Sequence, residues 1–435
     1  MLRTLKQAWT SGDLKKRLLY TMMIIIVFRL GSAIPIPFLN IDMLRVMMTA
    51  NSGGAALLKF FDTLSGGAFA QATMFALSVQ PTINASIIMQ LMGVAIPALE
   101  ALQKEGEQGR KKINAITRVL TIVLGLSQSF MYYKLLASAG AIKYVSGFDG
   151  FFCALVVLSV FTAGTAIIMW LGERVNENGV GNGVSILLFA GIVSRMPAII
   201  GKMIDLISQA IQNSELWINY VYVAISILIF LGMTWLIVFM NDAERRIPIL
   251  YAKRVVGRRM FDGNASHLPL KIGLAGVMPI VFASSMLSLP QMLSFAIKKD
   301  GILKACLNAI QMDTWLYKVV FFSLIIMFAY FYVSISYDPL EISNNLRQSG
   351  ATIPGFRPGK STSDFLSKVL SKVTLMGALF LAFIAIFPML LTSFKTLREL
   401  FIDGTSIIIM VGTALETVKL LQSQTMMRVY KGFLD

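Results

Sequence analysis

The fold class follows first from residues 217–240, which read WINYVYVAISILIFLGMTWLIVFM and carry no charged side chain. A helix needs about 20 consecutive apolar residues to cross a bilayer, so this run predicts a transmembrane helix. Directly after it, residues 241–270 carry a dense set of basic side chains, Arg245, Arg246, Arg258 and Arg259 among them. An apolar run of bilayer length that ends in a basic loop is typical of an integral membrane protein.

The composition extends this conclusion to the whole chain of 435 residues. Hydrophobic residues make up 56% and charged residues only 14%, whereas soluble domains have about 25% charged residues. The mean hydropathy is +0.70. These values exclude a water-soluble globule. The net charge of +16 is interpreted as a topology signal rather than as a nucleic-acid signal, because Lys and Arg accumulate in cytoplasmic loops.

Apolar windows predict an all-α polytopic membrane protein with ten spans and both termini on one side. Most Lys and Arg residues fall at the termini and in alternate loops, so that side is expected to be cytoplasmic. Five spans per half is an odd number, so two structural repeats would lie inverted in the membrane. The expected halves are 1–204 and 205–435. The spans are expected near 18–36, 75–97, 114–137, 151–171, 183–204, 217–240, 271–295, 315–337, 367–393 and 399–421.

The second apolar region differs from the others, because Gly66, Gly67 and Pro81 weaken a continuous helix. Irregular backbone at membrane depth persists only where it lines a cavity or is buried in protein. Two interpretations remain open. One is a short re-entrant segment near 60–75 followed by a pore-facing helix. The other is an amphipathic outer loop followed by a kinked helix.

Polar and charged side chains within the spans admit both a structural and a functional interpretation. Asn84, Ser86 and Gln90 would lie on one helix, where such groups either join helices or contact a substrate. Arg29 is the expected member of a buried pair, and Arg195 is expected to reach the interface from a helix end. The glycine-rich segment 172–183 lacks the Lys-Ser/Thr of a phosphate-binding loop, so we expect a tight cytoplasmic turn.

Two cytoplasmic segments, 241–270 and 338–366, are long enough to be docking surfaces rather than simple connections. A solvated basic loop is the alternative for 241–270. In the second segment, Thr352–Ile353–Pro354–Gly355–Phe356–Arg357–Pro358–Gly359–Lys360 forms a stiff tip that presents one Arg. A guanidinium held in this way makes bidentate contacts to carboxylates or phosphates. The basic residues expected to dock a partner are Arg245, Arg246, Lys253, Arg254, Arg258, Arg259, Arg357 and Lys360.

Enzymatic chemistry has no basis in this sequence. His267 is the only histidine and the two cysteines are far apart, so we expect no metal site, no cofactor and no catalytic triad. The spans also lack a run of acidic residues of the kind that proton or sodium relays use, which argues against an ion-coupled transporter with inverted repeats. A passive scaffold for membrane assembly remains a weaker alternative, because it would not need the broken second span.

Several long motifs, in order along the chain, resemble the SecY family, whose members are central subunits of protein-conducting channels. The resemblance covers essentially the whole chain. Val79–Gln80 stands where the family more usually has an apolar pair. The motifs are PTINASIIMQL (81–91), EGEQGRKKINAITR (105–118), WLGERVNENGVGNGVSILLFAGI (170–192), ERRIPILYAKRVVGRRM (244–260), HLPLKIGLAGVMPIVFASS (267–285) and TIPGFRPGK (352–360).

This resemblance implies a clamshell of two inverted five-helix halves around an hourglass pore. It implies a plug helix around Ser65–Gly66–Gly67–Ala68, and a lateral gate between the second and third helices on one side and the seventh and eighth on the other, with Asn84 and Gln90 near the seam. An aliphatic constriction at the midplane would resist water and ions by dewetting. The implied pore ring is Ile83, Ile87, Leu188, Ile192, Met278 and Ile409.

The function that the resemblance implies is passage of unfolded, signal-bearing precursor proteins across the bacterial cytoplasmic membrane and release of transmembrane helices into membrane lipid. The implied partners are the small membrane subunits SecE and SecG, the motor ATPase SecA and the ribosome. No nucleotide motif is present, so the energy would come from the partner.

Overall fold

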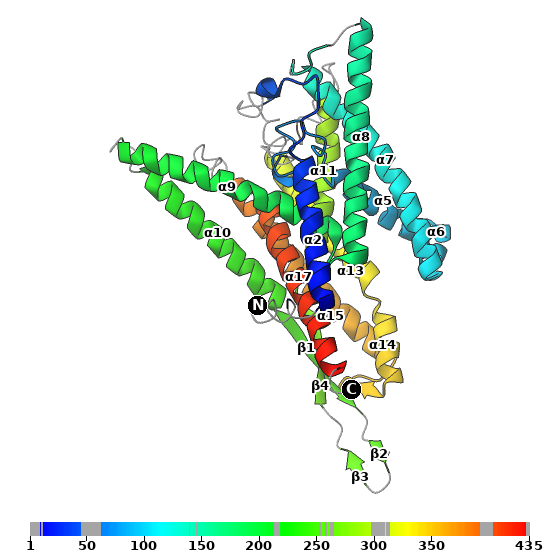
Figure 1. Ribbon diagram of the computed structural model, residues 1–435. Coiled ribbons are helices and arrows are strands. Elements are labelled where there is room, and N and C mark those ends of the chain that lie inside the picture. The colour runs from blue at the N-terminus through cyan, green and yellow to red at the C-terminus, as the bar shows by residue number, and fades with distance from the viewer. Residues whose placement is uncertain are drawn as a thin grey trace.

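The protein is a bundle of long helices with a β-ribbon projecting from one end, which we call the ribbon end (Figure 1). The structure, a computed structural model, describes residues 9, 12–44, 62–138, 140–144, 147–212, 218–251, 254–256, 259–261, 265–296, 309, 314–391 and 403–431. Its helices are α2 (Gly12–Gly31), α5 (Gln80–Ala95), α6 (Pro97–Lys104), α7 (Glu107–Ser138), α8 (Gly147–Asn178), α9 (Gly183–Gln212), α10 (Ile218–Asp242), α11 (Met278–Ala296), α13 (Trp315–Ser336), α14 (Pro339–Gln348), α15 (Lys360–Leu391) and α17 (Gly404–Lys431).

Each of the ten expected spans contains a helix of the described residues. Seven of these helices are long and apolar enough to cross a membrane, and the bent pair α5–α6 makes an eighth. The remaining two are α2 and α11; the apolar stretch of α11, Met278–Ser288, is shorter than a full crossing. Helix α9 runs past the expected boundary at residue 204, so that boundary falls within a helix.

The second span is broken at a different place from the one predicted. Pro81 lies in the first turn of α5, where proline is tolerated because that N–H has no helical partner anyway. The chain instead bends by 106° between α5 and α6, at Ile96–Pro97. Residues Ser65–Ala68, predicted as part of a short helix, form turns, and the helical turn before them covers residues 62–64.

The two expected halves meet along two lines of helix contact. On one side α11 packs against both α5 and α7, and α13 packs on the other side of α11. On the opposite side α9 packs against α10 and α17. The largest apolar cluster accordingly combines residues of α5 and α9 with residues of α11, α13, α15 and α17.

The chain is not purely helical, because segment 241–270 folds as a ribbon of antiparallel strands. Strands β1 (Glu244–Tyr251) and β4 (Ala265–Lys271) pair with Ile247 opposite Leu268, and β5 (Ala351–Thr352) pairs with the end of β1. Strands β2 (Arg254–Val256) and β3 (Arg259–Phe261) form a second pair. The expected loop at 241–270 is therefore wrong, because buried Ile247 and Ile249 alternate with exposed neighbours at the two-residue period of a strand.

The two long segments at the ribbon end form one packed unit. Ile247 and Leu270 of the ribbon lie in the same buried cluster as Ile353 of the tip and Leu366 of α15. No local pattern in the sequence indicates this contact, because the four residues come from segments that lie far apart in the chain. Figure 1 also shows α2 beginning and α17 ending toward the ribbon end.

Candidate functional site

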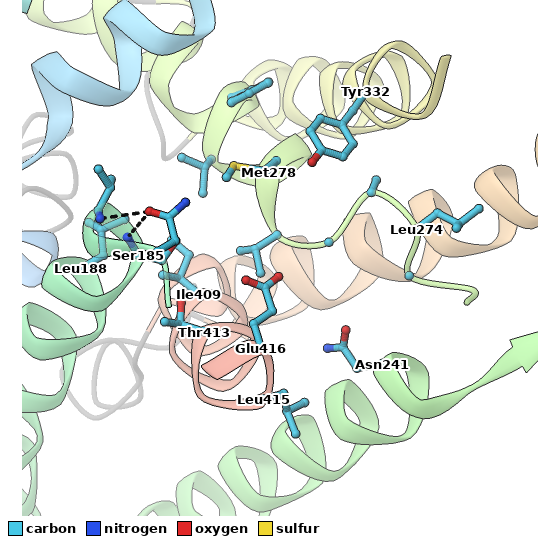
Figure 2. A pocket seen from close by; sticks show the side chains of 18 of the residues that line it. Ser185, Leu188, Asn241, Leu274, Met278, Tyr332, Ile409, Thr413, Leu415 and Glu416 are labelled. Carbon is cyan, nitrogen blue, oxygen red and sulfur yellow. Dashed lines mark hydrogen bonds between the residues drawn. The ribbon is translucent and has the colours of Figure 1, made fainter. Parts of the chain in front are cut away.

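A cavity of about 590 Å³ opens in the middle of the bundle, between the two halves. Helices α5, α9, α11 and α17 line it, together with the turn 273–277 that connects β4 to α11 (Figure 2). Four predicted ring residues form part of its wall: Ile83, Leu188, Met278 and Ile409. The cavity therefore reaches the aliphatic residues that the family resemblance implies for a pore ring.

The structure brings all six predicted ring residues into one apolar cluster. Ile83 and Ile87 are four residues apart on α5, and Leu188 and Ile192 are four apart on α9, so each pair lies on one helix face. Ile409 comes from α17, and Met278 is the first residue of α11. All are buried except Met278, which is half-buried. Such a cluster offers no polar group to water or ions.

Neutral polar groups surround the rest of the cavity, chiefly the amides of Gln90, Asn176, Asn182 and Asn241 and the hydroxyls of Ser86, Ser185 and Thr413. Two of these amides also hold the turn between α8 and α9. The Asn176 Oδ1 accepts from Gly183 N at 2.7 Å, and the Asn182 Oδ1 accepts from Val184 N at 3.1 Å. The predicted turn is therefore shorter than expected, since α8 continues to Asn178.

The segment 62–67, which contains the predicted plug residues Ser65, Gly66 and Gly67, is seated on α9. Asp62 is only 2% exposed and forms an ion pair with Arg195 of α9. Its other oxygen accepts from Ala70 N at 2.8 Å. Burial raises the pKa of the Asp62 carboxyl above its usual range, and the guanidinium of Arg195 opposes that rise.

This pairing corrects the expectation for the two arginines. Arg195 is the one that makes the buried ion pair, whereas Arg29 donates to the Ser32 hydroxyl at 3.3 Å. The sequence favours the reverse assignment, because the span expected there, 183–204, is shorter than the helix. In the structure α9 continues to Gln212, so Arg195 lies near its middle rather than near its end. The partner, Asp62, lies 133 positions earlier in the chain (195 − 62), so no local pattern connects them.

Backbone contact between the segment and α9 is close. The Ser194 hydroxyl donates to Gly191 O at 2.6 Å and lies 3.4 Å from Gly66 O. A Cβ on Gly191 would meet Leu64 O at 2.6 Å, and Gly66 adopts a φ of +67°. Glycine at both positions therefore permits an approach that any larger residue would prevent.

The following residues, including Ala68 of the predicted plug, are anchored elsewhere, on α7 and α8. The Tyr132 hydroxyl donates to Phe69 O at 2.7 Å, and the two rings stack with centroids 4.3 Å apart. Phe69, Ala72 and Leu77 belong to a second apolar cluster with Tyr132 and Phe161. After this anchored part, Phe75 and Val79 return to the apolar cluster that contains the ring residues.

Between α5 and α11 a buried polar contact crosses the predicted seam. Gln80 Nε2 donates to the Ser285 hydroxyl at 3.1 Å and lies 3.5 Å from the Ser288 hydroxyl. Asn84, one turn further along α5, is 3% exposed, and its Nδ2 has no hydrogen-bond partner among the described residues. Gln90, the other predicted seam residue, instead lines the cavity.

Comparison with known proteins agrees with this arrangement. The SecY family model matches residues 73–418. The protein translocase subunit SecY of Streptomyces coelicolor is 39% identical, and the alignment covers 100% of both chains. The chain belongs to the SecY family. A solved SecY structure has a TM-score of 0.66 to this chain at 17% identity, with 94% of this chain and 92% of that one covered. In that SecY protein the plug domain is described as maintaining a membrane seal. Sec61 in a canine ribosome–channel complex has a TM-score of 0.59 at 16% identity, with 94% and 92% covered.

The predicted docking residues of this SecY-family chain lie at the ribbon end. Arg245 and Arg246 are exposed on β1, where Arg246 pairs with Glu244 at 2.9 Å. Arg254 and Arg259 lie in β2 and β3, while Lys253 and Arg258 fall outside the described residues. Arg357 and Lys360 are exposed at the tip beside α15.

The tip itself is rigidly built. The rings of Phe356 and Phe365 stack with centroids 4.2 Å apart, and the Thr362 hydroxyl donates to Arg357 O at 2.8 Å. Ser343 of α14 donates to Gly359 O at 2.9 Å. Arg357 is thus presented to solvent on a fixed backbone.

Sequence reasoning missed three features of this SecY-family chain: the Asp62–Arg195 pair, the serines of α11 that receive Gln80, and Glu416 in the cavity wall. The serine pair had a readable signal, since Ser285 and Ser288 are three residues apart and therefore share one face of α11. Within the described residues, no group of three or more His, Cys, Asp or Glu side chains is placed to hold a metal ion.

Proposed function

We propose that this chain is the pore-forming subunit of a Sec protein translocase. It passes unfolded, signal-bearing proteins across the bacterial cytoplasmic membrane and releases transmembrane helices sideways into lipid. The observation that carries the proposal is the cavity of about 590 Å³ that ends on an aliphatic cluster drawn from both halves. A polar funnel that narrows to aliphatic side chains suits an extended polypeptide of any sequence.

The ring of Ile83, Ile87, Leu188, Ile192, Met278 and Ile409 is the proposed constriction. A narrow apolar ring excludes water and ions by dewetting when no polypeptide is present. It also makes no hydrogen bond that would hold one passing side chain longer than another. These two properties together allow a channel to be sealed at rest and permissive during transport.

The segment that contains Ser65, Gly66, Gly67 and Ala68 is the proposed plug. Its seat on α9 through Asp62 and Gly66 supports this role, because it lies next to the aliphatic cluster. We infer that residues 62–67 move during opening, while the part held by Tyr132 stays in place.

The proposed lateral exit lies where α11 and α13 meet α5 and α7, with Asn84 inside the seam and Gln90 at its cavity end. A signal sequence is an apolar helix. Its transfer through an open seam into lipid is favoured by about 25 cal/mol for each Å² of apolar surface removed from water.

The basic residues of the ribbon and the tip are the proposed docking surface for the motor ATPase SecA or the ribosome, and SecE and SecG are the proposed membrane subunits. A structural neighbour described in a ribosome–channel complex supports the ribosome as a partner. The ribbon end and both termini would then face the cytoplasm, as the positive-inside rule requires.

Protease protection tests the function directly. A signal-bearing precursor is added to liposomes that contain this chain and its SecE-type partner, with SecA and ATP outside. We expect protection that requires both ATP and the signal. Absence of protection, while a known SecY channel works in parallel liposomes, would refute the proposed function.

A further inference from the structure

One carboxylate, that of Glu416, stands among the described residues that line the cavity. Ile409, Thr413 and Glu416 are spaced four and three residues apart on α17, so they share one helix face. Figure 2 shows the Glu416 side chain directed into the cavity beside Thr413. Seven helical residues separate it from Ile409, which corresponds to about 10 Å toward the ribbon end.

The two cations that line the same cavity leave this carboxylate without a close partner. Lys419 is engaged elsewhere, because its Nζ lies 2.8 Å from Asp242 Oδ1 and donates to Asn241 O at 3.1 Å. Lys271 is exposed at the end of β4, and both it and Lys419 act on the Glu416 carboxylate only through longer-range electrostatic attraction. Among the described residues, no ion pair includes Glu416.

The rest of the wall cannot mask this charge. Apart from the two lysines, the polar residues of the described lining are amides and hydroxyls, which are neutral. A carboxylate in a cavity with low-dielectric walls produces a focused local field that attracts cations, and here it is the one negative charge of the described lining beside two lysines. The cavity therefore has one point where a cationic side chain would be preferred.

We propose that Glu416 determines specificity for basic residues of the passing polypeptide. The inference rests on the proposed function. Its carboxylate binds a Lys or Arg that precedes an apolar segment, and thereby holds the basic flank on the ribbon side of the aliphatic ring while the apolar segment occupies the ring.

The geometry also fixes the spacing of the recognised residue. A distance of about 10 Å corresponds to about three residues of extended chain and about seven residues of helix. A basic residue three to seven positions before the apolar segment reaches Glu416, whereas one placed about fifteen positions before it does not. Lys271 competes for the same carboxylate.

The alternative to substrate recognition is a purely structural role for Glu416. Glu416 could serve only to balance Lys271 at the base of the ribbon, with no contact to the substrate. In that case Glu416→Gln and Lys271→Gln would disturb the same structural feature. Both variants would impair every precursor alike, whatever its charge.

The experiment uses the complete channel in liposomes with SecE-type partner, SecA and ATP. Three precursors share one apolar segment: the first has no basic flank, the second has two Lys five positions before the segment, and the third has the same two Lys fifteen positions before it. The channel variants are Glu416→Gln, Glu416→Asp, Glu416→Lys and Lys271→Gln. Asp205→Asn, on exposed α9 surface outside the cavity, is the matched control.

For the original chain, we compare the fraction of each precursor that keeps its flank on the motor side. We expect this fraction to be about three- to tenfold higher for the second precursor than for the first, because a partly solvated charge pair contributes a modest energy. Glu416→Gln should abolish this preference, Glu416→Lys should reverse it, and Glu416→Asp should restore most of it. Lys271→Gln should increase the preference. Asp205→Asn should leave it unchanged, and the third precursor should behave like the first.

An unchanged preference in Glu416→Gln would overturn the inference while leaving the proposed function intact, because transport itself would continue. Equal loss for all precursors in both Glu416→Gln and Lys271→Gln would also overturn it, in favour of the structural role. Failure of the original chain to transport any precursor would instead count against the proposed function.

Discussion

The ion pair between Asp62 and Arg195 joins the proposed plug to α9. Removing one partner of a buried pair leaves an uncompensated charge, which costs about 3–5 kcal/mol when both groups are fully buried. Arg195 is 33% exposed, so solvent screening reduces the expected loss to about 1–2 kcal/mol. We therefore expect Arg195→Gln to loosen residues 62–67 and to raise resting ion leak in sealed liposomes that lack precursor.

A double-mutant cycle checks this assignment. Asp62→Asn combined with Arg195→Gln removes both charges, and the Asn oxygen can still accept from Ala70 N. The double variant should leak less than Arg195→Gln alone. Additive leaks would show that the two residues act independently and would contradict the role given to the pair.

Gly191 tests the close approach of the plug to α9. A Cβ at this position would meet Leu64 O at 2.6 Å, so Gly191→Ala must displace residues 64–66 or the helix. We expect higher resting leak, measured by the same flux assay. Gly201→Ala is the matched control on the same helix, because a Cβ there meets nothing within 4 Å. Equal leak from both variants would exclude this steric explanation.

At the scale of single residues, the sequence was least informative about which side chains contact one another. The aliphatic ring was implied by the family resemblance, whereas from helix period alone the sequence indicated only that Ile83 and Ile87 share one helix face. The sequence favoured the wrong arginine, because the partner of Arg195 is far away in the chain and the length of α9 was underestimated. Ion pairs between distant segments depend on packing that no local pattern encodes.

Helix α11 separates from α5 when the proposed seam opens, so the contacts between these two helices oppose opening. Gln80 donates across the seam to Ser285, and one such hydrogen bond contributes about 0.5–1.5 kcal/mol net. Gln80→Ala should therefore let less apolar signal sequences open the channel. The measurement is export of a series of precursors with graded signal hydrophobicity. Ser323→Ala, at an exposed position of α13, is the control, and an identical threshold in both variants would contradict the seam contact.

The tip before α15 presents Arg357 on a backbone fixed by Phe356, Phe365 and Thr362. Because its side chain is exposed, Arg357→Glu should leave the fold intact while it repels a partner that binds the guanidinium. We expect loss of motor-driven export with unchanged thermal stability. Arg347→Glu, exposed at the end of α14, is the matched control. Normal export by Arg357→Glu would refute the docking role of the tip.

Element positions were predictable wherever hydrophobic runs are long. The expected span 217–240 matches α10 at Ile218–Asp242 within two residues, because nothing inside it competes with the helix. The ribbon was missed because charged residues dominate 241–270 and obscure the alternation at Ile247 and Ile249. Pro97 was included in a span, although proline disfavours helix for the residue before it and here marks the bend at Ile96.

The molecule as a whole places its cavity between two halves that contact each other along α11 on one side and α9 on the other. The sequence predicts ten spans, whose parity requires any two structural repeats to lie inverted, and the family resemblance implies the clamshell formed by the two halves. The sequence could not give the charge pattern of the cavity, since the lining combines residues from 83 to 419. The central claim is that a polypeptide passes through this space and through the ring of Ile83, Ile87, Leu188, Ile192, Met278 and Ile409.

Site-specific cross-linking of an arrested precursor tests that claim most directly. A precursor with one cysteine in a polar mid-segment is stalled by a folded C-terminal domain in a channel whose native cysteines are replaced. Ile87→Cys and Ile409→Cys should each form a disulfide with the stalled chain, whereas Leu228→Cys, 72% exposed on α10, should not. Cross-links that favour Leu228→Cys, or none at either ring position while transport proceeds, would contradict the account.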